Sequence, residues 1–252
     1  MGSGTVPVTP VLGGVVALLL VVAAAVVWLG GIGRQWAVLR AGARGAVQLL
    51  LVSLIITYVV RWSWLVAVFI VVMFAIAVRT AGRRITSDRT WWWAAAPIAV
   101  GVGPVVALLL ATRAVPLTGL VLIPLVGQLI GGALTATALA GRRLLDELAQ
   151  RRGEVEAALA LGLSGRDSRL EISRPVAGTA LVPALDQTRT VGMVTLPGAF
   201  VGMLLGGADP VQAAVVQLFV LMGLLAVEAM AIAAVLEIVA RGLVTRPTAQ
   251  QP

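Results

Sequence analysis

The feature that most constrains this chain is a series of long apolar runs, most of which contain no charged residue. A helix needs about 20 apolar residues to cross the hydrocarbon core of a bilayer, which is roughly 30 Å thick. The sequence therefore predicts an all-α, polytopic membrane protein with a single transmembrane domain over residues 1–252. Seven spanning helices are expected, at residues 8–33, 42–60, 62–78, 91–112, 114–141, 190–208 and 211–240.

Composition supports this interpretation and excludes several kinds of chemistry. Apolar residues make up 60% of the chain and charged residues only 12%, whereas a soluble domain has about 45–50% and about 25%. The sequence contains no histidine, cysteine or lysine, which excludes a thiolate nucleophile, an imidazole base and a zinc site of the usual kind. A Walker A phosphate loop requires a lysine and is excluded for the same reason. We therefore expect no enzymatic activity and no cofactor bound by this chain.

The distribution of the arginines predicts the orientation in the membrane. With seven spans, all of the 19 basic residues except Arg61 and Arg113 fall on one side. Basic residues collect in cytoplasmic loops, so we expect this side to be the cytoplasm, with the N-terminus outside and the C-terminus inside. The protein is accordingly assigned to the cytoplasmic (inner) membrane, where it contacts lipid. Because the arginines are dispersed over four cytoplasmic segments, no nucleic-acid partner is expected.

The only long polar stretch, residues 142–189, lies between the fifth and sixth predicted spans. Leucines and valines recur in its first part near helical spacing, and Gly162 interrupts that pattern. We expect an amphipathic helix that breaks at Gly162, a turn through Ser164 and Gly165, and a second short helix from Asp167. This cytoplasmic helix-turn-helix either lies on the lipid headgroups or docks a cytoplasmic partner.

A motif in this loop favours the docking interpretation. Starting at Glu156, the chain reads Glu-Ala-Ala, three residues, Gly, nine residues, and then Ile-x-x-Pro. This spacing resembles the coupling loop of ABC-transporter permeases, in which small residues fit a groove of the ATPase subunit and the glycine permits a sharp turn. Arg174 replaces a leucine of the usual motif. The resemblance implies that coupling to a separate cytoplasmic ATPase depends on Glu156, Ala157, Ala158, Gly162, Ile172 and Pro175.

Segments on both sides of the loop resemble one particular family. They lie at residues 42–49, 124–131, 183–186 and 190–217. These segments are similar to the Fet-type iron-export permeases, a small membrane family with plant relatives linked to aluminium tolerance. The resemblance, which runs roughly from residue 40 to residue 240, implies a homodimeric membrane subunit that moves its substrate with ATP bound by the partner. Gln128, Gly132 and Val216 depart from the family pattern, so the substrate does not carry over with the fold.

Polar residues inside the predicted spans are candidates for a translocation path. A carboxylate at the centre of a span costs about 2.5–3.5 kcal/mol on insertion scales, so Glu228 should face protein or water. Gln217 lies 11 residues earlier, on the same face of the helix. Glu228 either lines a path that attracts cations or forms a hydrogen bond between helices. The candidate path residues are Gln48, Gln128, Asp186, Gln217 and Glu228.

Glycines repeat at four-residue spacing in two of the predicted spans. Gly198, Gly202 and Gly206 form one ridge, and Gly127 and Gly131 form a shorter one. Small residues at this spacing let helix backbones approach closely in lipid. The approach is either within the chain or between two copies of it.

Local features at the ends of the last two spans have simple structural explanations. Asp186 is expected to pair with Arg189, three residues later, or to couple the loop to the sixth span. Glu237 should pair with Arg241 at i,i+4 spacing. Asp209 and the proline after it should begin the last helix, because aspartate is a good N-cap and proline is favoured at the first helical position.

Two classes of function remain open. We expect the permease subunit of an ABC transporter, an exporter of the iron-export type, in which the ATPase pulls residues 142–175 and tilts the attached helices. The alternative is an ion-coupled secondary transporter that uses Glu228 and needs no ATPase, although no inverted repeat with paired broken helices supports it. A membrane-embedded enzyme would need an acidic pair within the membrane, and the spacing of the sequence indicates none.

Overall fold

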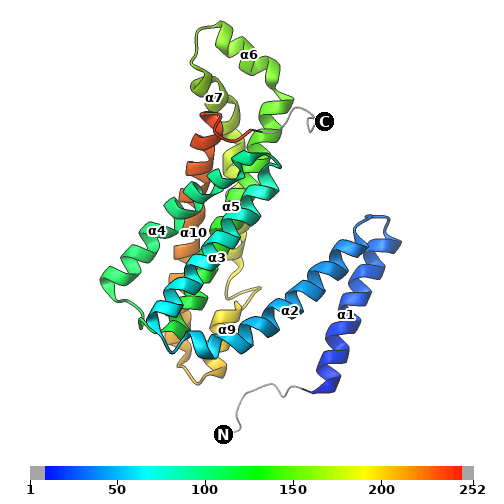
Figure 1. Cartoon of the computed structure of the whole chain (residues 1–252), viewed down its shortest axis with the longest axis vertical. Coiled ribbons are helices and arrows are strands. Elements are labelled where there is room, and N and C mark those ends of the chain that lie inside the picture. The colour runs from blue at the N-terminus through cyan, green and yellow to red at the C-terminus, as the bar shows by residue number, and fades with distance from the viewer. Residues whose placement is uncertain (1–8, 246–252) are drawn as a thin grey trace. The chain divides into compact units, whose positions relative to one another are not determined.

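The computed structural model describes residues 9–245 (Figure 1). The chain consists of two compact units, Met1–Trp62 and Ser63–Pro252. The described part of the chain contains helices and no strand. Six of its helices are long and apolar enough to cross a membrane. The expected all-α, polytopic fold is therefore confirmed. Val8, at the start of the first expected span, and Arg246, in the tail, lie outside the described residues.

The first unit is a hairpin of two helices, α1 (Pro10–Leu29) and α2 (Gln35–Val59). The hydroxyl of Thr9 caps α1 by accepting a hydrogen bond from a backbone N–H of its first turn. The helices meet where Gly42 leaves room for Leu20, since a Cβ at position 42 would lie 2.4 Å from Leu20 Cδ1. Most other side chains of this hairpin are exposed.

The core of the second unit lies where four helices meet. They are α3 (Ser63–Ile85), α4 (Ala95–Thr112), α5 (Gly119–Gln150) and α10 (Pro210–Ala240). α5 packs along α10, α3 packs mainly on α5, and α4 packs mainly on α10. A short 3-10 helix, η1 (Arg89–Ala94), leads from α3 into α4. α5 and α10 are therefore the central pair of this unit.

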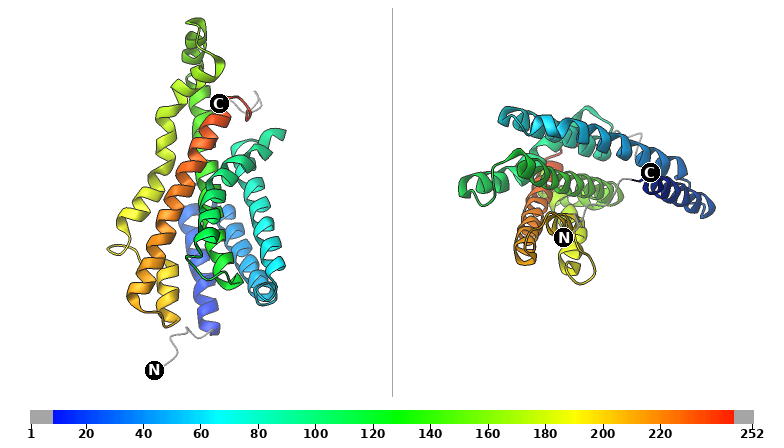
Figure 2. Two further views of the ribbon diagram at one scale, coloured as in Figure 1. Left: turned by 90° about the vertical axis from the view of Figure 1, so that its left-hand side faces the viewer. Right: turned by 90° about the horizontal axis from the view of Figure 1, so that it is seen from below.

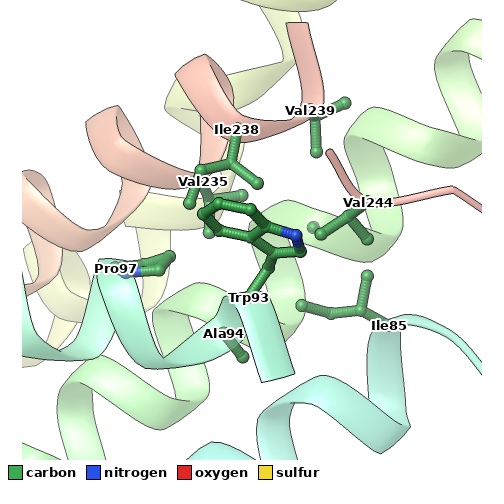
Figure 3. A pocket seen from close by; sticks show the side chains of 9 residues that line it. Ile85, Trp93, Ala94, Pro97, Val235, Ile238, Val239 and Val244 are labelled. Atoms are coloured by element: carbon green, nitrogen blue, oxygen red, sulfur yellow. The ribbon is translucent and has the colours of Figure 1, made fainter. Parts of the chain in front are cut away.

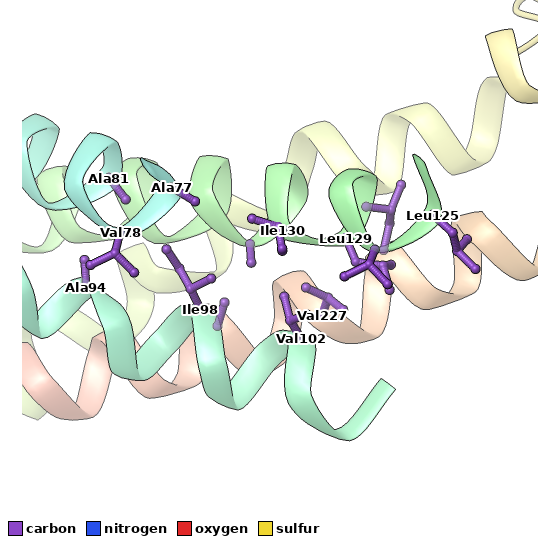
Figure 4. Close-up of a cluster of buried hydrophobic side chains, with 14 of the residues drawn as sticks. Ala77, Val78, Ala81, Ala94, Ile98, Val102, Leu125, Leu129, Ile130 and Val227 are labelled. Atoms are coloured by element: carbon purple, nitrogen blue, oxygen red, sulfur yellow. The ribbon is translucent and has the colours of Figure 1, made fainter. Parts of the chain in front are cut away.

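The largest apolar cluster fills the space between these helices (Figure 4). Ile98 of α4, Leu129 of α5 and Val227 of α10 are almost completely buried in it. In lipid, the association of helices depends on close packing, because lipid tails are as apolar as leucine. The helices approach closely only where their facing residues are small.

Replacing Gly101 with alanine is expected to destabilise this unit, because α4 and α10 come into backbone contact there. A Cβ at position 101 would lie 2.6 Å from the carbonyl oxygen of Val227, and such overpacking typically costs about 1–3 kcal/mol. Gly103 of α4 has no atom within 4 Å of the same point and is the matched control. Alanine at 103 should leave stability unchanged or slightly higher. Thermal unfolding in detergent measures the difference, and equal melting temperatures would contradict the expectation.

The expected sixth span, residues 190–208, is wrong as a single helix. Its only helical residues are Thr190, which is the last residue of α8 (Val182–Thr190), and those of α9 (Gly198–Leu205). The 8 residues of α9 reach about 12 Å at 1.5 Å per residue, which is too short to cross a bilayer. Between the two helices, the Thr190 carbonyl accepts hydrogen bonds from three successive backbone N–H groups, residues 193–195. Gly192, with φ of +81°, completes this turn and ends the helix.

The chain instead returns along α10 in a series of short helices. They are α7 (Gly165–Ala177), η2 (Gly178–Leu181), α8 and α9, and all four pack against α10 (Figure 2). α7 lies beside the C-terminal end of α10. α9 is joined by a turn to the first residue of α10. This broken segment follows α10 from one end to the other. The orientation of the chain in the membrane stays a prediction.

α3 and α5 extend beyond the ends expected at residues 78 and 141, to Ile85 and Gln150. The expected ends are placed before arginines, because charged residues indicate the membrane surface. A helix nevertheless continues past that surface wherever its backbone hydrogen bonds persist. α5 has 32 residues and is about 48 Å long, which exceeds the hydrocarbon core. Its last turns and α6 (Arg152–Ala160) project past the end of α10 (Figure 1).

Candidate functional site

The helix-turn-helix expected in the polar loop is present. After α6, Gly162 takes a left-handed conformation with φ of +91°, which glycine adopts without steric cost. The Ser164 hydroxyl then caps α7 by accepting a hydrogen bond from the Asp167 backbone N–H at 3.1 Å. The same hydroxyl donates to the Asp167 carboxylate at 2.7 Å. The second helix consequently begins at Gly165, two residues before the expected Asp167.

α6 is supported by its own ion pairs and buries none of its residues. Arg151, at the junction with α5, contacts Glu147 at 3.3 Å and also pairs with Glu154. Arg152 pairs with Glu156 at 2.8 Å. The hydrogen bond from Arg151 lowers the pKa of Glu154, and the hydrogen bonds to Glu154 and Glu147 raise the pKa of Arg151. Both groups are therefore charged near neutral pH and keep α6 attached to the end of α5.

An apolar edge runs from α6 into the turn. Leu161 is 83% exposed, and Leu159 and Leu163 beside it are also exposed. Ala157 is exposed and Ala158 is half-buried. Exposed apolar patches mark surfaces that contact proteins or membranes. The first half of the motif therefore lies on an open surface at the tip of a projecting element.

The second half of the motif lies against the helix bundle. Ile172 of α7 is buried, whereas Pro175 is exposed. Ala177 and Ala180, which follow, belong to a second apolar cluster that also contains residues of α5 and α10. The loop therefore has an outer part that is free in the described chain and an inner part that is packed.

α7 is fastened to the end of α10 by two arginines around one carboxylate. Arg166 Nε and Nη2 donate to the Glu237 carboxylate at 2.8 and 2.7 Å, and Arg241 Nε donates to it at 2.6 Å. Arg169 Nη1 donates to the carbonyl oxygen of Ala240 at 3.2 Å. The hydrogen bonds to Glu237 raise the pKa of Arg166. The expected Glu237–Arg241 pair is confirmed, whereas no sequence spacing indicates Arg166, which lies 71 residues from Glu237.

A small apolar cavity lies beside this network, around the indole of Trp93 (Figure 3). Residues of α3, η1, α4, α5 and α10 line it, together with Val244 from the segment after α10. Thr86 Oγ1 donates a hydrogen bond to the Thr245 carbonyl oxygen at 2.7 Å, which holds that segment against the end of α3. Because the lining is apolar, the cavity suits packing and offers no ligand to an ion.

Two of the candidate path residues lie on one helix, α10. Glu228 is half-buried, and its Oε1 lies 2.9 Å from the point where a Cβ of Gly132 would be. Because Gly132 has no side chain, the Glu228 carboxylate can pack closely against α5 at this position. Sequence spacing does not indicate this contact. Gln217 is only 4% exposed, and among residues 9–245 neither its amide nitrogen nor its amide oxygen has a hydrogen-bond partner. Buried polar groups without partners are rare in folded proteins, so Gln217 is a strong candidate for a functional role.

The other candidate path residues are not brought together. Gln128 of α5 is exposed, and Gln48 is exposed on α2 in the first unit. Asp186 of α8 is exposed and lies 3.8 Å from Arg189, in the local ion pair that its spacing predicts. Within residues 9–245, no three acidic side chains gather as they would in a carboxylate metal site.

The glycine ridges contain both packed and open positions. A Cβ at Gly127 would lie 2.6 Å from the terminal methyl carbon of Met73 on α3, so Gly127 admits a neighbouring helix of the same chain. Gly131, Gly198 and Gly202 have no atom within 4 Å of the corresponding point, and Gly206 meets only its own helix. In the described part of the chain, the ridge on α9 is therefore unoccupied by another helix.

These features define a class of protein: a polytopic membrane protein whose helical bundle carries a projecting helix-turn-helix. The chain belongs to the family described as uncharacterised protein family UPF0014, whose family model matches residues 12–244. The multi-pass membrane location is thus supported by family membership as well as by the apolar helices. No solved structure is significantly similar to the chain.

Relatives of known name include two plant proteins and one bacterial protein. The chain is 33% identical to the UPF0014 membrane protein STAR2 of Oryza sativa subsp. japonica over 194 residues, 75% of this chain and 68% of the relative. It is 31% identical to protein ALUMINUM SENSITIVE 3 of Arabidopsis thaliana over 182 residues, 71% of this chain and 66% of the relative. It is 30% identical to the probable iron export permease protein FetB of Escherichia coli (strain K12) over 123 residues, 49% of this chain and 48% of the relative. The resemblance to Fet-type iron-export permeases and their plant relatives is confirmed.

Proposed function

We propose that this chain is the membrane subunit of an ABC transporter, an exporter of the iron-export type driven by a separate cytoplasmic ATPase. The observation that carries the proposal is the projecting α6–α7 turn, whose leucines are exposed in the described chain. The similarity to a probable iron export permease supports the substrate class. In this proposal the ATPase binds ATP, and this chain binds no cofactor and catalyses no reaction.

The docking surface consists of α6 and the turn after it. Ala157 offers a small side chain to the groove of a partner, and Leu161 offers a large apolar one. Burying an exposed leucine contributes about 1.5–3 kcal/mol, so covering these leucines favours binding of a partner. Arg152 and Glu156 satisfy each other at the rim of the surface, which lets a partner approach without leaving a charge unpaired.

The translocation path in this proposal follows α10. Glu228 supplies a carboxylate within the spanning helix, and such groups face the protein interior or a water-filled path. Gln217 supplies an unpartnered amide on the same helix. Because the chain contains no histidine or cysteine, oxygen atoms of this kind are its main ligands for a passing cation.

A homodimer completes the proposal. Residues 191–197 are not helical, and α9 separates them by about 12 Å from the turn that leads into α10. If α10 spans the membrane, these residues lie within the hydrocarbon core. Non-helical backbone at that depth is tolerated only where protein or water covers it. Met193 and Val194 are exposed there, and Gly198 and Gly202 are open on α9. We assign this surface to contact with a second copy of the chain.

Purification from the native membrane tests this function. Protein captured through this chain in a mild detergent should bring down an ABC ATPase in similar amount, identified by mass spectrometry. A second ABC transporter of the same membrane serves as the control for complex integrity. If that control stays assembled and this chain is recovered alone, the proposal is contradicted. The result would then favour an ion-coupled secondary transporter that uses Glu228.

A further inference from the structure

α10 joins the two ends of the proposed mechanism. Its C-terminal end carries Glu237, which α7 contacts through Arg166, and its spanning part carries Gln217 and Glu228. Glu228 and Glu237 are 9 residues apart, or about 13 Å along the helix. Both residues lie in the uninterrupted helix α10, so a rigid movement of its C-terminal end would also move Glu228.

The contact between α7 and α10 is both polar and apolar. At the start of α7, Arg166 binds the Glu237 carboxylate with two nitrogens, and Arg169 donates to the Ala240 carbonyl. At its end, Ala177 shares an apolar cluster with Val235 and other residues of α10. Contacts at both ends of α7 fix its angle to α10 as well as its distance.

α6 is attached to the bundle differently. None of its residues is buried, and its ion pairs are made within the helix or with the end of α5. A partner that moves α6 therefore acts on the membrane helices through α7 or through α5. Charged side chains attach α7 to α10. α7 and η2 also pack on α5 through the second apolar cluster, and Arg143 of α5 donates a hydrogen bond to Thr179 of η2 at 2.7 Å.

We propose that Glu237 is a positioning residue that fastens α7 to α10, so that movement of the α6–α7 turn by the partner is delivered to Gln217 and Glu228. The inference rests on the proposed function, because it needs a partner that moves the turn. Beyond the proposed function, the inference identifies α10 as the helix that carries this movement into the membrane.

The geometry of the ion pair suits transmission of movement better than stabilisation of the fold. The side chains of Arg166 and Glu237 are 43% and 32% exposed, and exposed ion pairs add little to folding stability. A bidentate guanidinium–carboxylate contact nevertheless fixes the relative orientation of the two side chains. Arg241, one turn further along, donates to the same carboxylate. Loss of the Arg166–Glu237 contact should therefore weaken coupling without unfolding the chain.

The absence of cysteine from the chain allows a direct test. The double variant Arg166→Cys/Glu237→Cys removes the ion pair, and a bis-methanethiosulfonate reagent of matching length then joins the two positions covalently. The intact complex with its ATPase is reconstituted in proteoliposomes, and ferrous iron transported per ATP hydrolysed is measured. Before cross-linking, this ratio should fall about fivefold, the effect of one charge-assisted contact, while the ATPase still co-purifies. Cross-linking should restore most of the ratio.

Two results with the Arg166→Cys/Glu237→Cys variant would overturn this proposal. One is an unchanged ratio before cross-linking, and the other is loss of transport on cross-linking, which would mean that α7 and α10 must separate. The matched control, Arg143→Cys/Thr179→Cys, removes the hydrogen bond to α5 instead and should leave the ratio unchanged. An equal loss in the control would show that the route is not specific to α10. Absence of the ATPase from the wild-type complex is the separate failure of the proposed function, and it is visible before any transport is measured.

Discussion

Replacing Gly162 with tryptophan is expected to remove the ATPase from the purified complex. Gly162 has φ of +91°, and a residue with a Cβ pays about 1–2 kcal/mol to adopt a left-handed conformation. Relief of that strain reshapes the turn, and the indole covers the exposed Leu161 and Leu163. ATPase recovered per membrane subunit should fall at least about tenfold, because each 1.4 kcal/mol of lost affinity is a factor of ten.

Gly178→Trp provides the matched control for this experiment. Gly178 lies in η2, outside the turn, and no atom lies within 4 Å of its Cβ position. Its φ of −60° is compatible with any residue, so the same bulk is added without strain and away from α6. The ATPase should be recovered with this variant as with the unaltered chain. Full recovery with Gly162→Trp as well would show that the turn is not the docking surface.

Replacing Gln217 with leucine is expected to stabilise the protein and to abolish most of its transport. Both amide atoms of Gln217 are buried and have no partner within the described part of the chain, and leaving a buried polar group unsatisfied costs about 1–3 kcal/mol. Leucine has a similar size and needs no hydrogen bond, so the melting temperature should rise. If Gln217 serves a cation path, iron transport should nevertheless fall at least about tenfold, since leucine offers no polar atom to a passing cation.

The combination of these two readouts separates function from folding. Gln212→Leu is the control, because Gln212 is an exposed amide on the same helix, and it should change neither property. Purified variants are compared by thermal unfolding in detergent and by iron transport with the ATPase present. A Gln217→Leu variant that transports normally would remove Gln217 from the path. A variant that loses both stability and transport would indicate a structural role.

Sequence reasoning succeeded where the chemistry is local. Apolar run length located six helices that the structure confirms. The break at Gly162 and the Glu237–Arg241 pair are likewise set by neighbours in the chain. Asp209 caps α10 by accepting hydrogen bonds from the backbone N–H groups of residues 211 and 212, as its type and position predict. For the break at Gly162, the ion pair and the cap, the residues that decide the structure lie within four positions of one another.

Features that neither hydropathy nor helical spacing encodes could not be predicted from the sequence. Hydropathy alone does not reveal that residues 191–197 leave the helix, because the turn depends on hydrogen bonds to one carbonyl, that of Thr190. Arg166 meets Glu237 only after the chain has folded back along α10. The approach of Glu228 to Gly132 likewise requires the packing of α10 on α5. Periodicity indicates which residues share a face, but it does not identify the helix that the face meets.

Transport by the purified complex tests the central claim most directly. Proteoliposomes that contain this chain and its ATPase, with the nucleotide sites facing outwards, are supplied with radioactive ferrous iron in the external medium. An exporter driven by the ATPase should carry iron inwards only when ATP is present, and replacement of the Walker A lysine of the ATPase should stop it. Iron uptake that proceeds without ATP and follows an imposed ion gradient would contradict the account.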